Sequence, residues 1–186
     1  DEQHRFGVKQ RQALESKGKS PHVLIMTATP IPRTMALSVY GDLDVSFIKG
    51  MPPGRHPVKT YVVGSHMLQR IFRFMKKEME SGHQAYVVCP LVEQSEKQDL
   101  AAAVSVYENL RDHVFPQFGV GLVHGRMKNA EKEQVMEDFR KGKFKLLVAT
   151  SVIEVGVNVP DATVMFVYGA DRFGLSQLHQ LRGRVG

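Results

Sequence analysis

Short apolar runs alternate with amphipathic stretches along most of the chain. The runs with the pattern of buried strands are residues 58–63, 85–89, 120–123, 146–149 and 163–168. The stretches with helical spacing are residues 67–79, 100–114 and 129–140. Strands that alternate with helices of about 10–15 residues predict a parallel sheet with helices on both faces. The sequence therefore predicts an α/β fold.

The first fifty residues show the same alternation of helices and strands over fewer elements. It consists of a helix, a buried parallel strand and a second helix, at residues 5–17, 22–27 and 32–40. Three prolines and two glycines then fall within residues 50–57, and they break helix and sheet alike. We therefore expect two lobes, residues 1–49 and 58–186, joined by a hinge at 50–57.

The composition excludes several classes of protein. Hydrophobic residues make up 42% and charged residues 24% of the 186 positions, as in a globular chain. No apolar run approaches the ~18 residues that a membrane span needs. Cys89 is the single cysteine, so an internal disulfide and a cysteine-rich zinc site are excluded, which fits a reducing cytoplasm. The net charge of +6 is spread along the chain and permits nucleic-acid binding without demanding it.

Asp1, Glu2, Gln3 and His4 are the first candidate site. Two adjacent acids followed by a glutamine and a histidine are typical of a nucleotide-hydrolysing site at the end of a strand. There the first acid holds a magnesium ion, the second orients or deprotonates the attacking water, and the histidine senses the phosphate. Taken alone, such an acidic pair is more often a solvated pair of charges.

Thr27 and Thr29 lie where the strand at residues 22–27 ends, and Arg33 begins the next helix. Hydroxyls at the carboxyl end of a strand lie at the edge where open α/β sheets bind their ligands. A threonine- and proline-containing turn without chemistry is the alternative.

Residues 13–20 satisfy a loose phosphate-loop pattern. A phosphate loop needs a strand to enter it and a helix to leave it, whereas here a helix enters and a strand leaves. We therefore expect the acids of a magnesium site without its phosphate loop, and no ATP turnover by this chain alone.

Two loops of the second lobe carry polar and basic side chains directly after predicted strands. Their residues are His124, Gly125 and Arg126 in one loop and Thr150, Ser151 and Glu154 in the other. Hydroxyls, backbone N–H groups and basic side chains at such an edge contact a nucleic-acid backbone without reading its sequence. Each loop taken singly is also explained as a solvated turn.

The last ten residues place Arg182 and Arg184 near Gln180 and two glycines. A guanidinium there suits an arginine finger, which offers planar donors to the charge that develops on a transferring phosphoryl group. The alternative is a basic helix end in solvent, which the glycines between the arginines disfavour.

Five stretches occur in the order and spacing of helicase superfamily two: DEQHRFGV, TATPIPRT, LVHGRMK, LLVATSVIEVGVNVP and QLHQLRGRVG. Their wording resembles the RecG family of ATP-dependent DNA helicases over essentially the whole chain. The transcription-repair coupling translocase is similar in the second and last stretches, but Gln3 and LVHGRMK favour the RecG family. The resemblance implies two RecA-like lobes of the P-loop NTPase type, the C-terminal part of the first and most of the second.

The resemblance also implies roles for individual residues. The implied catalytic residues are Asp1, which also holds the metal, Glu2, His4, Gln180 and Arg184. The implied coupling residues are Gln3, Thr27, Thr29 and Arg33. The implied DNA contacts are His124, Gly125, Arg126, Thr150, Ser151 and Glu154, and the implied nucleotide contacts are Gly156, Asn158 and Arg184. Asn158 stands where the superfamily more often has an aspartate, and the final arginine of the last motif would lie one residue past Gly186.

The function implied by the resemblance is an ATP-dependent helicase or translocase that remodels branched DNA in repair and recombination, with ATP and Mg²⁺ as cofactors. The implied partners are double-stranded and branched DNA and replication-fork proteins, with no membrane, in a bacterial cytoplasm. Two other classes stay open. One is a non-catalytic module that binds the DNA backbone, and the other is an RNA helicase of the same superfamily, which TATPIPRT disfavours.

Overall fold

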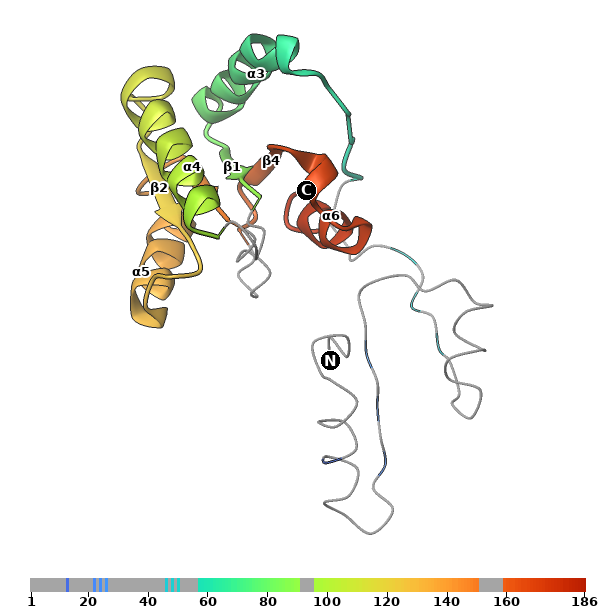
Figure 1. Cartoon of the computed structure of the whole chain (residues 1–186). Coiled ribbons are helices and arrows are strands. Elements are labelled where there is room, and N and C mark those ends of the chain that lie inside the picture. Colours follow the sequence, from blue (N-terminus) through green and yellow to red (C-terminus); the bar gives the residue numbers. More distant parts are fainter. Residues whose placement is uncertain are drawn as a thin grey trace. The chain divides into compact units, whose positions relative to one another are not determined.

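The computed structural model describes residues 57–90, 96–150 and 159–186, together with single positions among the first fifty residues. The chain divides into two compact units, Asp1–Met51 and Pro52–Gly186, and the sheet with its helices belongs to the second unit (Figure 1). The elements predicted within residues 1–49, and most of the predicted hinge, lie outside the described residues. The predicted division into lobes stays a prediction.

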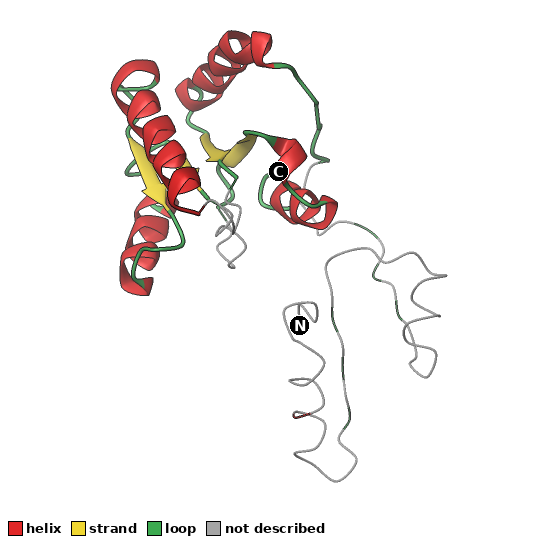
Figure 2. Cartoon of the chain, in the orientation of Figure 1, coloured by secondary structure: helices red, strands yellow, loops and turns green. Residues whose placement is uncertain are grey.

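The second unit is built on a parallel sheet of four strands. The strands are β1 (Gln84–Val88), β2 (Val120–Val123), β3 (Leu146–Ala149) and β4 (Ala162–Val167). Their order across the sheet is β2-β3-β1-β4, and each neighbouring pair is parallel. Figure 2 shows the strands of this unit with helices around them. The predicted parallel α/β fold is confirmed.

Helices follow the strands as the periodicity predicts. They are α3 (Leu68–Glu80), α4 (Glu96–Asn109), α5 (Asn129–Arg140) and α6 (Leu175–Arg182). A short 3₁₀ turn, η2 (Ser65–Met67), precedes α3, and a π-helical turn, η4 (Leu110–Val114), continues α4. Helix α4 begins four residues before the predicted start at residue 100, and the sequence pattern missed α6 and the 3₁₀ turn η6 (Ala170–Arg172) before it.

The predicted strand at residues 58–63 is wrong. No strand forms in this described segment, and the side chains of Tyr61 and Val62 are largely exposed. Of its apolar residues, Val58 packs against the core. A run rich in β-branched residues becomes a strand only when a neighbouring strand supplies its hydrogen bonds, so the pattern alone was not sufficient.

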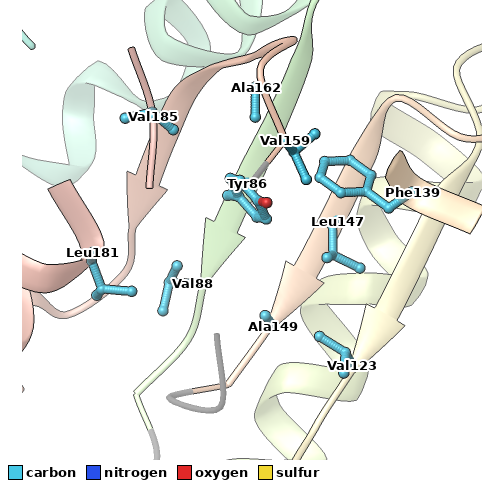
Figure 3. Packing of buried hydrophobic residues seen from close by; sticks show 10 residues of the cluster. All are labelled: Tyr86, Val88, Val123, Phe139, Leu147, Ala149, Val159, Ala162, Leu181 and Val185. Atoms are coloured by element: carbon cyan, nitrogen blue, oxygen red, sulfur yellow. The ribbon is translucent and has the colours of Figure 1, made fainter. Parts of the chain in front are cut away.

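The two faces of the sheet are covered by different helices, because side chains alternate along each strand. On one face Val87 and Val148 pack against Met75 of α3 and Leu110 of η4. The other face is covered by α5 and α6, as Figure 3 shows for the cluster Tyr86, Val88, Val123, Phe139, Leu147, Ala149, Val159, Ala162, Leu181 and Val185. The predicted helices on both faces are therefore present.

Aromatic contacts bind α5 to the sheet. Phe139 is fully buried, with its ring centroid 5.0 Å from that of Tyr86 and 5.6 Å from that of Phe144. Complete burial of such a side chain contributes about 1.5–3 kcal/mol. The ring of Phe144 occupies the space that a Cβ at position 121 would need, which explains the glycine on β2.

Paired polar groups close the amino edge of the sheet. The buried Gln84 donates from Nε2 to the carbonyl oxygens of Phe139, at 2.6 Å, and Phe144, at 3.1 Å. Lys145 donates from Nζ to the carbonyl oxygen of Gly82 at 2.7 Å. These contacts hold the end of α5 and the turn before β1 in place.

Among the described residues, no helix is long and apolar enough to cross a membrane.

Candidate nucleic-acid interface

The residues that follow the four strands share the carboxyl edge of the sheet. Ala149 pairs in register with Val123 on one side and Val88 on the other, and Val88 pairs with Val167. Consequently His124, Thr150, Cys89 and Tyr168 lie at this edge in the order of the strands. Open α/β sheets bind ligands at this edge.

The loop between β2 and α5, residues 124–128, forms a turn that two internal hydrogen bonds hold together. The N–H of His124 donates to Sδ of Met127 at 3.4 Å, and the N–H of Met127 donates to the carbonyl oxygen of His124 at 3.2 Å. Met127 also packs against the cluster on the α5 side of the sheet. The loop is therefore folded around the partly buried side chain of Met127, while Gly125 and Arg126 stay exposed.

Helix α5 begins directly behind this loop. Lys128 is its N-cap, with an extended backbone, and its N–H donates to Oε2 of Glu131 at 2.9 Å. An acid in the first turn of a helix is favourable beside the positive end of the helix dipole. This cap fixes where the loop ends and the helix starts.

Arg126, Lys128 and Lys132 give the loop its positive charge. Burial, and after it the charges of Lys132 and Arg126, hold the pKa of the His124 imidazole below its usual value, while Glu131 opposes them. Because that usual value is already below 7, His124 is neutral at pH 7. The positive charge around this loop therefore comes from the basic side chains and not from the imidazole.

Two buried polar atoms at this edge have no hydrogen-bond partner among the described residues. They are Nδ1 of His124 and Oγ1 of Thr150. Thr150 is fully buried, and its N–H donates to the carbonyl oxygen of Val123 at 3.2 Å, so the two side chains come from neighbouring strands. Unpaired buried polar groups are costly, which makes this edge chemically different from the rest of the described core.

Helix α6 positions Gln180 and Arg184 beside the core. Leu181 and Val185 are buried in the cluster on the α5 and α6 side, and Arg184 lies between them in the sequence. The helix ends at Arg182, and the N–H of Arg184 bonds back to the carbonyl oxygen of Leu181 at 2.9 Å. Arg184 therefore lies just after the end of the helix, beside the buried Val185, and is not a residue of a solvated helix.

The guanidinium of Arg184 also lies close enough to Tyr86 to influence its titration. Burial raises the pKa of the Tyr86 hydroxyl to about 12, against the opposing positive charge of Arg184. The phenol consequently stays protonated at neutral pH.

The structure adds residues that sequence reasoning missed. Lys132 of α5 donates from Nζ to the carbonyl oxygen of Gly125 at 2.8 Å. Arg172, just before α6, donates to both carboxylate oxygens of the buried Asp99 of α4, at 2.9 and 3.1 Å. Seventy-three positions separate the latter pair, so no local pattern could have found it. Lys132 stands one helical turn after Lys128, a spacing that could have drawn attention to it.

Several predicted site residues lie outside the described residues. They are Asp1, Glu2, Gln3, His4, Thr27, Thr29, Arg33, Ser151, Glu154, Gly156 and Asn158. Within the described ranges, no group of three or more histidines, cysteines and acids could hold a metal ion. The structure brings His124 and Thr150 together, with Gly125 and Arg126 on the loop of His124, and the roles of all these residues stay predictions.

The chain has counterparts among known proteins. Residues 65–186 match the family model described as the helicase conserved C-terminal domain, and the chain belongs to this family. The whole chain is 56% identical to the ATP-dependent DNA helicase RecG of Bacillus subtilis and 54% identical to that of Synechocystis sp.. It covers 27% and 22% of their lengths, so it spans about a quarter of the curated relatives it matches.

A solved structure of RecG bound to a three-way DNA junction matches the whole chain with a TM-score of 0.73 at 46% identity, and the chain covers 23% of it. The resemblance to the RecG family and the RecA-like α/β fold are thus confirmed.

Proposed function

We propose that this chain is a working part of an ATP-dependent DNA helicase that moves along double-stranded DNA and remodels branched DNA. The observation that carries the proposal is the identity of 54–56%, along all 186 residues, to relatives named ATP-dependent DNA helicase RecG. The match to a RecG structure that holds a three-way DNA junction supports branched DNA as the partner. Repair and recombination are the processes in which such an activity would be used.

The grip on DNA is assigned to the carboxyl edge of the sheet. Arg126 and Lys128 are exposed on the β2–α5 loop, and basic side chains at such positions bind phosphate oxygens independently of sequence. A motor that moves along DNA needs contacts of this kind, because it has to hold every sequence equally well. The buried hydroxyl of Thr150 and the imidazole of His124 would line the edge of the sheet beside this loop.

The hydrolytic part of the proposal concerns Asp1, Glu2 and Arg184. Asp1 supplies a carboxylate, the oxygen ligand that Mg²⁺ prefers, and Mg²⁺ would neutralise charge on the phosphates of ATP. Glu2 would take a proton from the attacking water, and Arg184 would stabilise the charge that develops on the phosphoryl group. The anchored position of Arg184 between two buried residues supports its role.

The test is a chimera in which this chain replaces the matching segment of Bacillus subtilis RecG. The relative supplies the remainder of the enzyme, and the two segments are 56% identical. We expect magnesium-dependent ATP turnover that forked DNA stimulates. Arg184→Ala should reduce the stimulated turnover by at least roughly a thousandfold, because an arginine finger contributes about 10³–10⁵ in known cases. Glu2→Gln should reduce it by at least roughly a hundredfold, because a general base contributes about 10²–10⁴.

Lys141→Ala is the matched control, because it removes a charge from an exposed position at the far end of α5, where Lys141 pairs with Glu137. Turnover in this variant should equal that of the parent chimera. Full turnover in the Glu2→Gln or Arg184→Ala chimera would refute the hydrolytic assignment.

The alternative classes make different predictions in the same assay. A module that only binds the DNA backbone would bind duplex with strong salt dependence but would leave the chimera inactive. An RNA helicase would be stimulated by RNA and not by forked DNA. Comparison of forked DNA, linear duplex and RNA as activators separates the three.

A further inference from the structure

Lys132 ties the exposed β2–α5 loop to the helix behind it. Its Nζ lies 2.8 Å from the carbonyl oxygen of Gly125, seven residues earlier in the chain. Side chains on a helix lean toward its amino end, so a lysine in the fourth position of α5 is directed at the loop that precedes the helix. The position of Lys132 on the helix therefore favours this contact.

This contact fixes more than one atom. The carbonyl of Gly125 and the N–H of Arg126 belong to the same planar peptide group. A glycine before that peptide would otherwise let the plane turn freely. By holding the oxygen, Lys132 sets the orientation of the plane from which the side chain of Arg126 departs.

We infer that Lys132 is a positioning residue, which holds the Gly125 carbonyl so that the loop presents Arg126 to the phosphates of a nucleic-acid backbone. The inference rests on the proposed function, since it concerns the same edge of the sheet. An ammonium has three donors, and the bond to Gly125 uses one of them.

The charges around His124 support this arrangement. Burial is the main reason that the pKa of His124 is lowered, and Lys132 is the first of the charges that lower it further. Arg126 acts in the same direction and Glu131 in the opposite one. The ammonium of Lys132 therefore stands beside both the imidazole and the carbonyl of the same loop.

The chain provides a matched control at the opposite edge of the sheet. Lys145 donates from Nζ to the carbonyl oxygen of Gly82 at 2.7 Å, so it also binds a glycine carbonyl. Both lysines are partly exposed. Lys132→Met and Lys145→Met remove the same charge and the same type of hydrogen bond, and they differ in the edge that they affect.

The first measurements use the full chain without DNA. In Lys132→Met we expect faster hydrogen exchange at the amide of Met127 and a higher NMR-measured pKa of His124. Lys132→Arg should restore the low His124 pKa, and Lys145→Met should change neither quantity. Equal exchange rates and equal His124 pKa values in Lys132→Met and Lys145→Met would overturn the inference.

The second measurement is the affinity for a forked DNA duplex at several salt concentrations. Loss of one phosphate contact alone lowers the affinity roughly fivefold at physiological salt. If Lys132 positions the loop, Lys132→Met should cost more than roughly tenfold, because Arg126 loses its orientation as well. A loss no larger than that of Lys145→Met overturns the inference, whereas failure of the unmodified chain to bind DNA refutes the proposed DNA grip itself.

Discussion

The two edges of the sheet use the same kinds of residue in opposite ways. At the amino edge the buried amide of Gln84 donates two hydrogen bonds, to the carbonyl oxygens of Phe139 and Phe144. At the carboxyl edge the buried hydroxyl of Thr150 and the buried Nδ1 of His124 have no partner among the described residues. A buried polar group costs free energy unless it is paired, so the side chain of Gln84 stabilises the fold and these two unpaired groups do not.

This difference indicates which edge serves a ligand. A buried polar group that has no partner in the fold is explained if it bonds to a ligand, and functional sites are the usual places for such groups. The exposed basic residues of the loop 124–128 point to the same edge. Each prediction below tests one part of this contrast.

The largest effect is expected at the amino edge, for Gln84→Met. Methionine fills a similar volume but donates no hydrogen bond, so two carbonyl oxygens lose a donor in a buried setting. We expect the free energy of unfolding to fall by about 1–3 kcal/mol. Urea denaturation followed by circular dichroism measures it.

Gln134→Met is the control for this prediction. Gln134 is an exposed glutamine of α5 whose Nε2 donates to Oδ1 of Asp138 at 2.8 Å. Its replacement should change stability by less than about 0.5 kcal/mol. If both glutamine variants lose the same stability, the amino edge is not the stabilising one.

Much of the fold of the second unit followed from its hydrophobic pattern. The bounds of β2, β3 and α5 agree with the predicted ranges, because a buried parallel strand requires a continuous apolar run and α5 has a clear cap. The run at 58–63 failed for a physical reason, since strand pairing depends on a neighbour that the run itself does not specify. Helix α6 was missed because it has only 8 residues, too few to show a clear helical period between the glycines at its two ends.

The candidate site was predictable in part. A polar residue directly after a buried strand must lie at the carboxyl edge, which is why His124 and Thr150 could be named from the sequence. The contact of Lys132 with Gly125 and the ion pair of Arg172 with Asp99 depend on three-dimensional packing, so the sequence could not specify them. The roles of the residues outside the described ranges rest on the family resemblance.

An intermediate effect is expected for DNA affinity when charges at the two edges are compared. Arg126 lies on the loop at the carboxyl edge, whereas Lys143 lies before β3, at the amino edge, and pairs with Asp138 at 2.7 Å. Arg126→Ala should reduce the slope of log affinity against log salt by about 0.9, the value of one phosphate contact on duplex DNA. Lys143→Ala should leave the slope unchanged.

Fluorescence anisotropy with a labelled duplex at four salt concentrations measures both slopes. Equal slope changes in the two variants would mean that the protein attracts DNA through its overall charge and that the carboxyl edge has no special role.

The smallest effect on stability is expected for Thr150→Val, and it is the sharpest test of the contrast. Valine has nearly the shape of threonine, and the hydroxyl that it lacks has no partner among the described residues. Removal of an unpaired buried hydroxyl should therefore leave the free energy of unfolding unchanged or raise it by up to about 1 kcal/mol. The same change should weaken duplex binding if the hydroxyl serves the ligand, and Thr150→Ser should bind like the unmodified chain. A loss of stability as large as that of Gln84→Met would show that Thr150 is paired in solution, and the two edges would then be equivalent in this respect.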